Sequence, residues 1–382
     1  MARLIDFFKN IRKLISFDIA KSIVFFAGYP FTSRLADGYY QRVFEIDSLL
    51  GSRCKRIYVD KNFSNEQNSW LSQVDETTIV IGYYGGAWKK AILNIILYIL
   101  IIISKRIYIH SALRLEEAIP FIRIPFVNVF FDLHGAVPEE ADYLGDYKKK
   151  IFYNYLERIA VEQAAYVIVV SVAMKNYLAF KYPDVDLNNK FIILPIFKSH
   201  PVNYNRALTN RRPVIIYSGG VQKWQQALKI VELINSTSKL YRYTICTADP
   251  IFFRSHISVD AIEQDRVDID CLTNRALMEK YTECDYGLIL RKDHILNRVS
   301  CPTKLIEYLC MGVIPVFDSD NIGDFKKMGV QFISCSALYR NALPSIDARM
   351  EMVHNNYKVY ERFLRIQGVG KLSLIKAIFG DI

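Results

Sequence analysis

The sequence predicts an α/β protein of two domains, each built on a parallel sheet that helices cover. Three observations support this prediction. The chain has 382 residues, of which 51% are hydrophobic and 23% are charged, and this suits two folded domains of roughly 150 residues or more. Short apolar runs alternate with longer mixed segments, as strands and helices do in a parallel sheet. The alternation occurs twice, on either side of a polar segment at 198–212.

The expected strands form two sets. The first set lies at 22–27, 56–59, 78–82, 106–110, 127–132, 166–171 and 191–194, and the second at 214–217, 243–247, 266–269, 286–290, 314–317 and 331–334. Helical patterns are expected between most of these strands, and two further helices are expected at 347–364 and 371–379. We therefore divide the chain into an N-terminal domain at 1–200, a second domain at 201–345, and C-terminal helices at 346–382 that return to the first domain.

The first candidate site follows the first strand of the second set. Two similar α/β domains leave a cleft between them, and ligands of open parallel sheets bind beyond the carboxyl ends of strands. Gly219 and Gly220 lie at such an end, and Lys223 follows just before a helical pattern. Glycines let an anion approach the backbone, while the helix start and the lysine attract its charge. A diphosphate suits this loop, although a plain tight turn explains the same residues equally well.

A second candidate site follows the fourth strand of that set. Arg291 comes first, and Ser300 and Pro302 then precede a helical pattern with Lys304 and Glu307 on one face. A helix N-terminus binds phosphate, and a carboxylate one turn further along can accept two hydrogen bonds from a ribose diol. By spacing alone, an i,i+3 surface salt bridge between Lys304 and Glu307 is the better interpretation.

These residues carry a resemblance. The segment 300–316 resembles the nucleotide-sugar signature of GT-B glycosyltransferases of the family 4 type, in which serine, proline, lysine and a Glu-Tyr pair precede a glycine and a Pro-Val pair. The loop 217–223 resembles the first glycine loop of the family's donor domain, and 132–140 resembles its acceptor-domain D-x-H-G element. The segment 28–42 resembles bacterial surface-polysaccharide members. The resemblance covers about residues 20 to 365, in the family's order and spacing.

The resemblance implies two Rossmann-like domains that face each other across a cleft, with a C-terminal helix packed back on the first. It implies a nucleotide-sugar donor as substrate and no separate cofactor. The implied donor-binding residues are Gly219, Gly220, Lys223, Arg291, Ser300, Pro302, Lys304 and Glu307, with Glu307 on the ribose hydroxyls. The implied catalytic residues are His134, beside the transferred sugar, and Asp132. Many members carry a second glutamate eight positions before the ribose-binding one, where this chain has Val299.

No metal site is expected. The seven cysteines are widely spaced and form no CxxC pair, and the six histidines are scattered, so we expect reduced and mostly buried thiols in a cytoplasmic protein. Asp318 and Asp320 have the spacing of a metal-binding pair, but we interpret them as a helix-capping loop. Fixed cations around a leaving phosphate stabilise its developing charge without a metal.

Two segments suggest contact with a membrane. Residues 1–17 place Leu4, Phe8, Ile11 and Ile15 on one helical face with basic residues elsewhere, which suits either an anionic bilayer surface or a helix packed on the first sheet. The uncharged run 91–103 would span about 20 Å as a helix, less than the roughly 30 Å of a bilayer core. It can be buried against the sheet or lie on a membrane, and we favour the membrane because the run is apolar on every side.

The net charge also favours an anionic partner. The chain carries 49 basic and 39 acidic side chains, so its net charge is 49 − 39 = +10. This attracts anionic lipids. Nucleic acid is not expected as a partner, because the basic residues are dispersed and no binding motif is present. The N-terminus lacks a signal-peptide cleavage site, and the sequence predicts no membrane-spanning run.

The sequence therefore predicts a glycosyltransferase that moves a sugar from a nucleoside-diphosphate sugar to a lipid-linked saccharide acceptor. We expect it to act without a metal, with retention at the anomeric carbon, in bacterial capsule, O-antigen or exopolysaccharide synthesis. Its expected place is the cytoplasm, peripheral on the inner face of the cell membrane. Two alternatives remain: a nucleotide-sugar 2-epimerase of the same fold, and a catalytically silent, membrane-associated partner of a glycosyltransferase.

Overall fold

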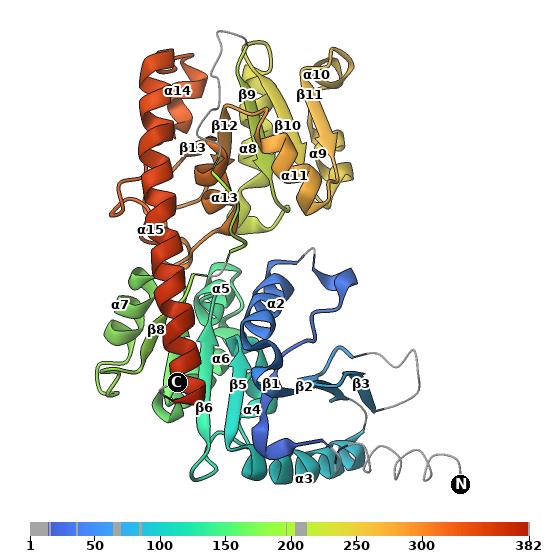
Figure 1. Ribbon diagram of the computed structural model, residues 1–382. Helices are drawn as coiled ribbons and strands as arrows, with labels where there is room; N and C mark the ends of the chain where they lie inside the picture. The colour runs from blue at the N-terminus through green and yellow to red at the C-terminus, as the bar shows by residue number, and fades with distance from the viewer. Residues whose placement is uncertain are drawn as a thin grey trace. The chain divides into compact units, whose positions relative to one another are not determined.

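The computed structural model describes residues 14, 17–35, 37–63, 70–83, 86–195, 197–202 and 212–380. The chain forms two compact units. Unit 1 comprises Met1–Val170, Lys175–Leu194 and Val369–Ile382, and unit 2 comprises Ser171–Met174 and Pro195–Gly368. Each unit contains a sheet with helices packed around it (Figure 1), so the α/β class is confirmed. The expected N-terminal helix at 1–17 lies almost wholly outside the described residues.

The sheet of unit 1 has eight strands in the order β3-β4-β2-β1-β5-β6-β7-β8. All neighbouring strands pair in parallel except β3 and β4, which are antiparallel. Every residue of β1 and β4 is buried, as expected for a parallel sheet with both faces covered. The strands are β1 (Ser22–Phe26), β2 (Lys55–Asp60), β3 (Leu71–Asp75), β4 (Thr78–Gly82), β5 (Arg106–His110), β6 (Asn128–Leu133), β7 (Tyr166–Val169) and β8 (Phe191–Ile193).

Several helices of this unit begin at a side-chain cap. Asp37 caps α2 by accepting a hydrogen bond from the Tyr39 amide, and Asp146 caps α6 by accepting one from the Lys149 amide. The α-helices are α2 (Gly38–Leu50), α3 (Ala87–Ser104), α4 (Leu115–Ala118), α5 (Val137–Tyr143), α6 (Tyr147–Gln163) and α7 (Val172–Lys181). Short 3-10 turns are η1 (Ile19–Lys21), η2 (Thr32–Arg34), η3 (Gly51–Arg53) and η4 (Ala112–Arg114).

The sheet of unit 2 has six strands in the order β11-β10-β9-β12-β13-β14, and all neighbouring strands pair in parallel. Its strands are β9 (Val214–Ser218), β10 (Arg242–Cys246), β11 (Val267–Asp270), β12 (Tyr286–Ile289), β13 (Ile314–Phe317) and β14 (Ile333–Ser334). Its helices are η5 (Lys223–Gln225), α8 (Ala227–Thr237), α9 (Pro250–His256), α10 (Val259–Glu263), α11 (Asn274–Tyr281), α12 (Ile295–Arg298), α13 (Thr303–Met311) and α14 (Cys335–Tyr339). The long helix α15 (Ile346–Phe379) belongs to unit 2 up to Gly368 and to unit 1 from Val369 on.

Each strand predicted from the sequence is present to within about two residues, but two other features differ. Strand β3 was not predicted, because it is a short edge strand whose residues are largely exposed and polar. The C-terminal region forms one helix, α15, where two were predicted. Gly370 lies inside this helix, and a side chain there would collide with the carbonyl oxygen of Ile193. The glycine therefore permits close packing rather than ending the helix.

The seven cysteines are all free thiols. Cys271 is exposed and Cys301 is partly exposed, whereas the other five are buried. Burial raises the pKa of Cys246 and of Cys310 to about 12. Most of the thiols therefore act as small apolar residues of the core.

Candidate functional site

The residues predicted to bind the donor gather at the carboxyl end of β9 and the start of α13, within unit 2. Gly219 follows β9, has a φ of 154°, and its amide donates to the carbonyl of Cys246 at 3.0 Å. A side chain at Gly219 would collide with the ammonium group of Lys304. The structure thus brings the glycine loop and the predicted phosphate-binding lysine into contact, although they are far apart in the sequence.

Lys304 lies on the first turn of α13. Its Nζ donates to the side-chain oxygen of Gln225 at 2.9 Å and lies 5.0 Å from the centre of the Tyr217 ring. Burial, together with the nearby positive charge of Arg291, lowers the pKa of Lys304 to about 7. The neutral amine form of a lysine so placed takes up a proton readily when an anion binds beside it.

Arg291 supplies a second cation, and this one is buried. It comes after β12, and its Nη1 donates to the side-chain oxygen of Asn297 at 3.0 Å. Burial lowers the pKa of Arg291 to about 10. Among the described residues, neither Arg291 nor Lys304 forms an ion pair with a carboxylate. The partly buried Lys304 and the buried Arg291 lie beside a glycine loop and are hydrogen-bonded to neutral amide groups, which suits an anionic ligand such as a diphosphate.

Glu307 lies one turn further along α13 than Lys304. Its Oε2 accepts a hydrogen bond from the Tyr281 hydroxyl at 3.1 Å, and that hydroxyl is 2.7 Å from the Oγ of Ser218. Burial raises the pKa of Glu307. Lys304 and Glu307 thus bond to Gln225 and Tyr281 rather than to each other. The surface salt bridge that spacing alone favoured is wrong, because both side chains turn toward the end of the sheet.

The other predicted donor residues have different surroundings. Pro302 is the N-cap of α13, and the Oγ of Ser300 donates to the Asn297 carbonyl at 3.0 Å, so both shape the helix start. The carbonyl of Gly220 accepts a hydrogen bond from the Tyr217 hydroxyl at 2.5 Å. Lys223 lies in η5 with an exposed side chain. The structure therefore brings Gly219, Arg291 and Lys304 together and leaves Lys223 at the surface.

Asp132 lies near the end of β6 in unit 1 and is fully buried. The Arg42 guanidinium donates to both of its oxygens, with Nη2 2.6 Å from Oδ1, and the Tyr108 hydroxyl donates to Oδ2 at 2.7 Å. Burial alone would raise the pKa of Asp132, but Arg42 holds it well below its ordinary value. The carboxylate is therefore ionised and held in place, which suits a positioning role rather than proton transfer.

His134 lies two residues after Asp132, and its ring stacks on that of His110 with the ring centres 4.5 Å apart. The Tyr39 ring packs edge-on against both, with centres 4.6 Å from His110 and 5.8 Å from His134. The Nδ1 of His110 is 3.4 Å from Oδ2 of Asp132. Burial lowers the pKa of both histidines, so both are neutral at pH 7.

The ligand atoms of His110, Asp132 and His134 lie within 4.8 Å of one another, which is close enough to hold a metal ion. A cation there would compete with Arg42, whose guanidinium already occupies both carboxylate oxygens. The geometry therefore suits a hydrogen-bonded cluster better than a metal site.

In unit 2, Asp318 pairs with a lysine at 2.6 Å and Asp320 pairs with another at 2.7 Å. The loop that holds these two aspartates precedes no helix, so the prediction of a helix-capping loop is wrong.

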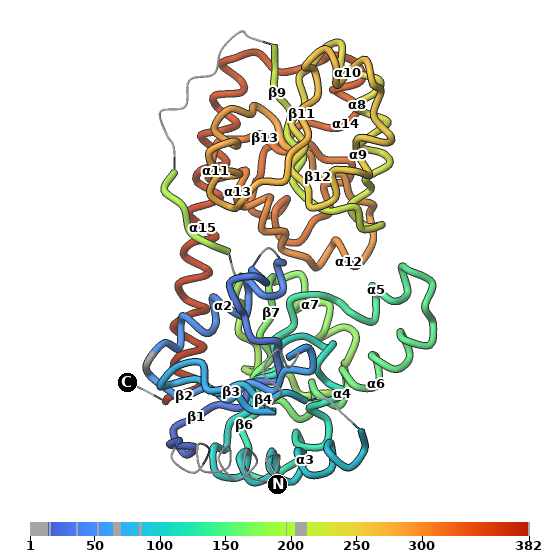
Figure 2. Tube along the Cα trace, turned by 90° about the vertical axis from the view of Figure 1, so that its right-hand side faces the viewer, coloured from blue at the N-terminus to red at the C-terminus, as the bar shows by residue number. Residues whose placement is uncertain are grey.

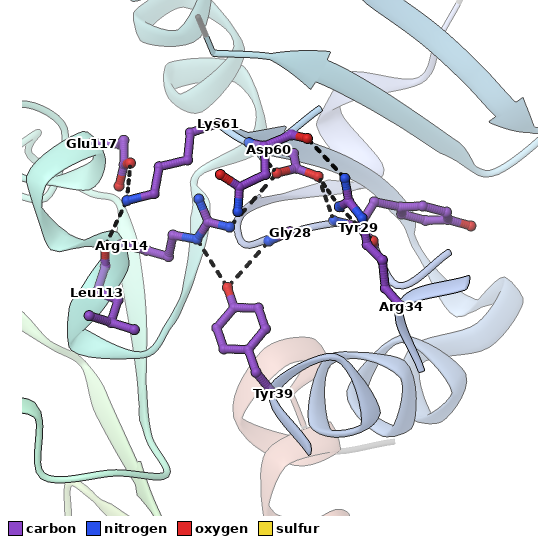
Figure 3. Close-up of polar contacts among 10 residues, drawn as sticks. Gly28, Tyr29, Arg34, Tyr39, Asp60, Lys61, Leu113, Arg114 and Glu117 are labelled. Atoms are coloured by element: carbon purple, nitrogen blue, oxygen red, sulfur yellow. Dashed lines mark hydrogen bonds and ion pairs between the residues drawn. The ribbon is translucent and has the colours of Figure 1, made fainter. Parts of the chain in front are cut away.

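In unit 1, a second polar cluster lies at the carboxyl edge of the sheet, the edge at which Asp132 and His110 also lie (Figure 3). The buried Asp60, at the end of β2, accepts hydrogen bonds from the Tyr29 amide at 3.1 Å and from Arg34 at 2.7 Å. Arg114 donates to the Tyr39 hydroxyl at 3.0 Å, and the Gly28 amide donates to the same hydroxyl at 3.3 Å. This cluster fixes the loop after β1, and the carboxyl edge of the sheet is where an open α/β domain binds ligands.

His110, Tyr108 and Arg42 are not among the site residues that the sequence predicts. The strand that ends at His110 was predicted, and the rule that site residues follow strands points to this histidine. Tyr39 and Arg42 lie within the 28–42 segment that carried the resemblance, but nothing in the sequence shows that Arg42 reaches Asp132.

Solved structures provide the comparison with known proteins. Sucrose-phosphate synthase from Thermosynechococcus elongatus matches 93% of this chain and 98% of its own, with a TM-score of 0.66 and 13% identity. OtsA, a trehalose-6-phosphate synthase, matches 95% of this chain and 99% of its own, with a TM-score of 0.60 and 12% identity. HepE from Anabaena, in complex with UDP-glucose, matches 93% and 99%, with a TM-score of 0.62 and 11% identity.

These matches extend over both units. The chain has the GT-B fold. No protein-family model matches the sequence, and a search of curated proteins finds no match. At such low identity the likeness concerns the fold, so the function has to be argued from the site itself.

Proposed function

We propose that this chain is a glycosyltransferase of the family 4 type that uses a nucleoside-diphosphate sugar. The observation that carries the proposal is the pair of cations at a glycine loop and a helix start, the partly buried Lys304 and the buried Arg291. Such a site is built for a diphosphate. Two structures with this fold support the choice of donor, since HepE was solved with UDP-glucose and the E. coli trehalose-6-phosphate structure is bound with UDP-2-fluoro glucose.

The chemistry follows from where charge develops. When the bond between the anomeric carbon and the diphosphate breaks, negative charge grows on the leaving phosphate and positive character grows on the sugar. Fixed cations stabilise that change more than they stabilise the intact donor. Lys304 and Arg291 provide this stabilisation from the protein itself. We therefore expect transfer without a required metal, and activity that persists in the presence of a chelator.

Glu307 gives the nucleotide its second anchor. The Tyr281 hydroxyl orients its carboxylate, and the neighbouring helix turn carries Lys304. A ribose diol can donate two hydrogen bonds to a carboxylate held in this way. Val299 is buried, and its carbonyl accepts a hydrogen bond from Ser171 at 2.7 Å. Recognition of the sugar hydroxyls therefore has to come from groups other than the second glutamate that many family members carry.

Unit 1 supplies the acceptor side of the proposal. His134 is a neutral ring held by stacking on His110, and it is suited to hydrogen bonding with a sugar hydroxyl. Asp132 acts as a positioning residue through the cluster that it forms with Arg42 and Tyr108. In the proposed reaction the acceptor hydroxyl attacks from the face that the diphosphate leaves, with retention.

The proposed acceptor is a lipid-linked saccharide of bacterial capsule, O-antigen or exopolysaccharide synthesis. The net charge of +10 and the exposed apolar residues of α3 support work at the inner face of the cell membrane. A lipid-linked acceptor is held at such a surface, so an enzyme that uses it gains from binding there.

Nucleotide binding tests the donor site. Glu307→Ala is expected to weaken UDP or GDP binding about tenfold or more in calorimetry, since two charge-assisted hydrogen bonds are lost. Glu232→Ala, which removes an exposed carboxylate of α8 in the same unit, is the matched control and is expected to bind as the wild type does. Equal affinity in the two variants contradicts the assignment of Glu307.

Turnover tests the reaction. The purified protein is incubated with a panel of UDP-, GDP- and other nucleotide sugars and a bacterial lipid extract, and free nucleotide and labelled lipid are followed. Labelled lipid is the expected result. An epimerised donor without transfer would identify a 2-epimerase, and no turnover with any donor would identify a catalytically silent partner.

A further inference from the structure

Helix α3 is unusual among the helices that the structure describes. It spans Ala87–Ser104, five residues longer than the uncharged run 91–103, and it alone among the described helices is long and apolar enough to cross a membrane by length and composition. Only 28% of its length is buried inside the protein. A helix that covers a sheet in water normally presents a polar outer face, and α3 does not.

Two opposite faces of α3 can be told apart by burial. The inner face packs against unit 1 through Leu93, Leu97, Leu100 and Ile101. The outer face carries exposed apolar side chains at intervals of four, three, four and three residues, which is one stripe of an α-helix. The stripe consists of Trp88, Ile92, Ile95, Ile99 and Ile102, and Tyr98 and Ile103 flank it. Trp88 is 86% exposed and Ile95 is 64% exposed.

The packing of α3 excludes a spanning role in this fold. Its inner face contacts β1 and η1 of the sheet domain, so lipid cannot surround the helix while unit 1 is folded. Figure 1 and Figure 2 both show α3 at the outer edge of unit 1. A helix with one face fixed on a sheet and the other apolar and exposed can lie in the surface of a bilayer.

Charged and aromatic groups at its ends fit the same arrangement. Lys89 and Lys90 are exposed at the start of α3, and Lys105 is exposed at its end. The amide of Asn128 donates to the carbonyl of Lys105 at 2.9 Å, which places the loop before β6 at this end of the helix. That loop carries Phe126, which is 92% exposed. Lysines at both ends of an apolar stripe match the anionic headgroups around an apolar interior.

We propose that the stripe of α3, together with Phe126, is a membrane-docking surface that inserts into the headgroup region of an anionic bilayer. The inference deepens the proposed function, because it names the surface that would bring the chain to a lipid-linked acceptor. It rests on that function for its biological meaning, but the docking itself needs neither donor nor acceptor. A test of vesicle binding can therefore fail or succeed separately from a test of transfer.

The test measures partition of the full chain onto vesicles by flotation. One set of vesicles is zwitterionic phosphatidylcholine, and the other also contains about a third phosphatidylglycerol. The wild type is expected to bind the anionic vesicles and to bind them less at high salt. Trp88→Glu and Ile95→Glu are each expected to lower the partition coefficient about tenfold, since each replaces an apolar side chain that enters the bilayer surface by a charge. Circular dichroism and the midpoint of thermal unfolding confirm that each variant is folded, without reference to nucleotide binding.

Two control variants make the test specific. Ile151→Glu changes an exposed residue of α6 in the same unit, and Ile251→Glu changes an exposed residue of α9 in unit 2; these positions are 70% and 78% exposed. Both are expected to bind vesicles as the wild type does. If Ile151→Glu releases the protein while Trp88→Glu does not, the surface is wrongly placed and the proposal fails.

Two other outcomes overturn the proposal. Undiminished vesicle binding in the Trp88→Glu, Ile95→Glu double variant would show that another part of the chain, such as 1–17, carries the membrane contact. A wild type that is dimeric without vesicles, and that the double variant converts to a monomer, would show that the stripe is an interface between two copies. Sedimentation of both proteins in the absence of lipid makes that distinction.

Discussion

Donor binding is expected to take up a proton, and Lys304 is the reason. Its pKa is lowered to about 7 in the protein without ligand, because burial and Arg291 disfavour the ammonium form. A bound diphosphate adds negative charge beside it and raises that pKa. The contribution of Lys304 to binding is therefore complete below pH 7 and is lost as the pH rises toward the pKa of the complex.

The size of the effect follows from this pKa. At pH 8 a group with a pKa of about 7 is about one-tenth protonated, so binding should take up about 0.9 proton there and about 0.1 proton at pH 6. Affinity should fall about tenfold from pH 6 to pH 8 and about tenfold more by pH 9. The terminal phosphate of UDP or GDP loses its own proton near pH 6, so measurements between pH 7.5 and 9 isolate the lysine.

Calorimetry in buffers of different ionisation enthalpy measures this uptake directly. The slope of the observed heat against the buffer enthalpy gives the number of protons bound with the nucleotide. Lys304→Met, which has no group to titrate, is expected to bind more weakly and to take up no proton. Wild-type binding at pH 8 without proton uptake would refute the reasoning, and so would equal uptake in Lys304→Met.

Three further predictions concern other parts of the two sites. Gly219→Ala is expected to weaken nucleotide binding, because a side chain there displaces Lys304 and the φ of 154° disfavours it; wild-type affinity in calorimetry would contradict the close contact. Arg42→Met is expected to destabilise the protein by about 3 to 5 kcal/mol in urea unfolding, because it leaves Asp132 charged and buried. Adding Asp132→Asn should recover part of that loss, and a purely additive double variant would argue against the pair. His134→Ala is expected to lower turnover at least tenfold while leaving UDP affinity unchanged, and a matching loss of affinity would place His134 elsewhere.

The sequence was informative where local pattern decides structure. Buried strands such as β1 are apolar runs in the sequence. The start of α13 directly after Pro302 follows from the proline and from the helical spacing of the residues after it. Strand β3 has no such signal, because its side chains are mostly exposed and its pairing with β4 is what makes it a strand. The sequence predicts two helices in place of α15, because glycine disfavours a helix interior. The close contact between Gly370 and the Ile193 carbonyl, which explains the glycine, is visible only in the fold.

Motifs in the sequence predict candidate site residues, but they do not predict the contacts that these residues make in the fold. Gly219 and Lys304 were named from motifs, yet only the fold shows them in contact. Spacing favoured a Lys304–Glu307 ion pair, and the structure gives each a different partner because Gln225 and Tyr281 come from other elements. Contacts between residues that are distant in the chain depend on how the sheet orders its strands, and local sequence does not carry that order.

The arrangement of the cysteines gives the molecule an experimental handle. Cys271 follows the last residue of β11, at the carboxyl edge of the sheet that also carries Gly219; it is exposed, Cys301 is partly exposed, and the other five thiols are buried. Thiols such as Cys246 and Cys310, buried and with a raised pKa, hold too little thiolate to compete for a reagent. A fluorescent maleimide should therefore react first at Cys271, more slowly at Cys301, and least at the buried thiols. The label then reports on unit 2 without any substitution in the chain, since Cys271 and Cys301 both lie in that unit.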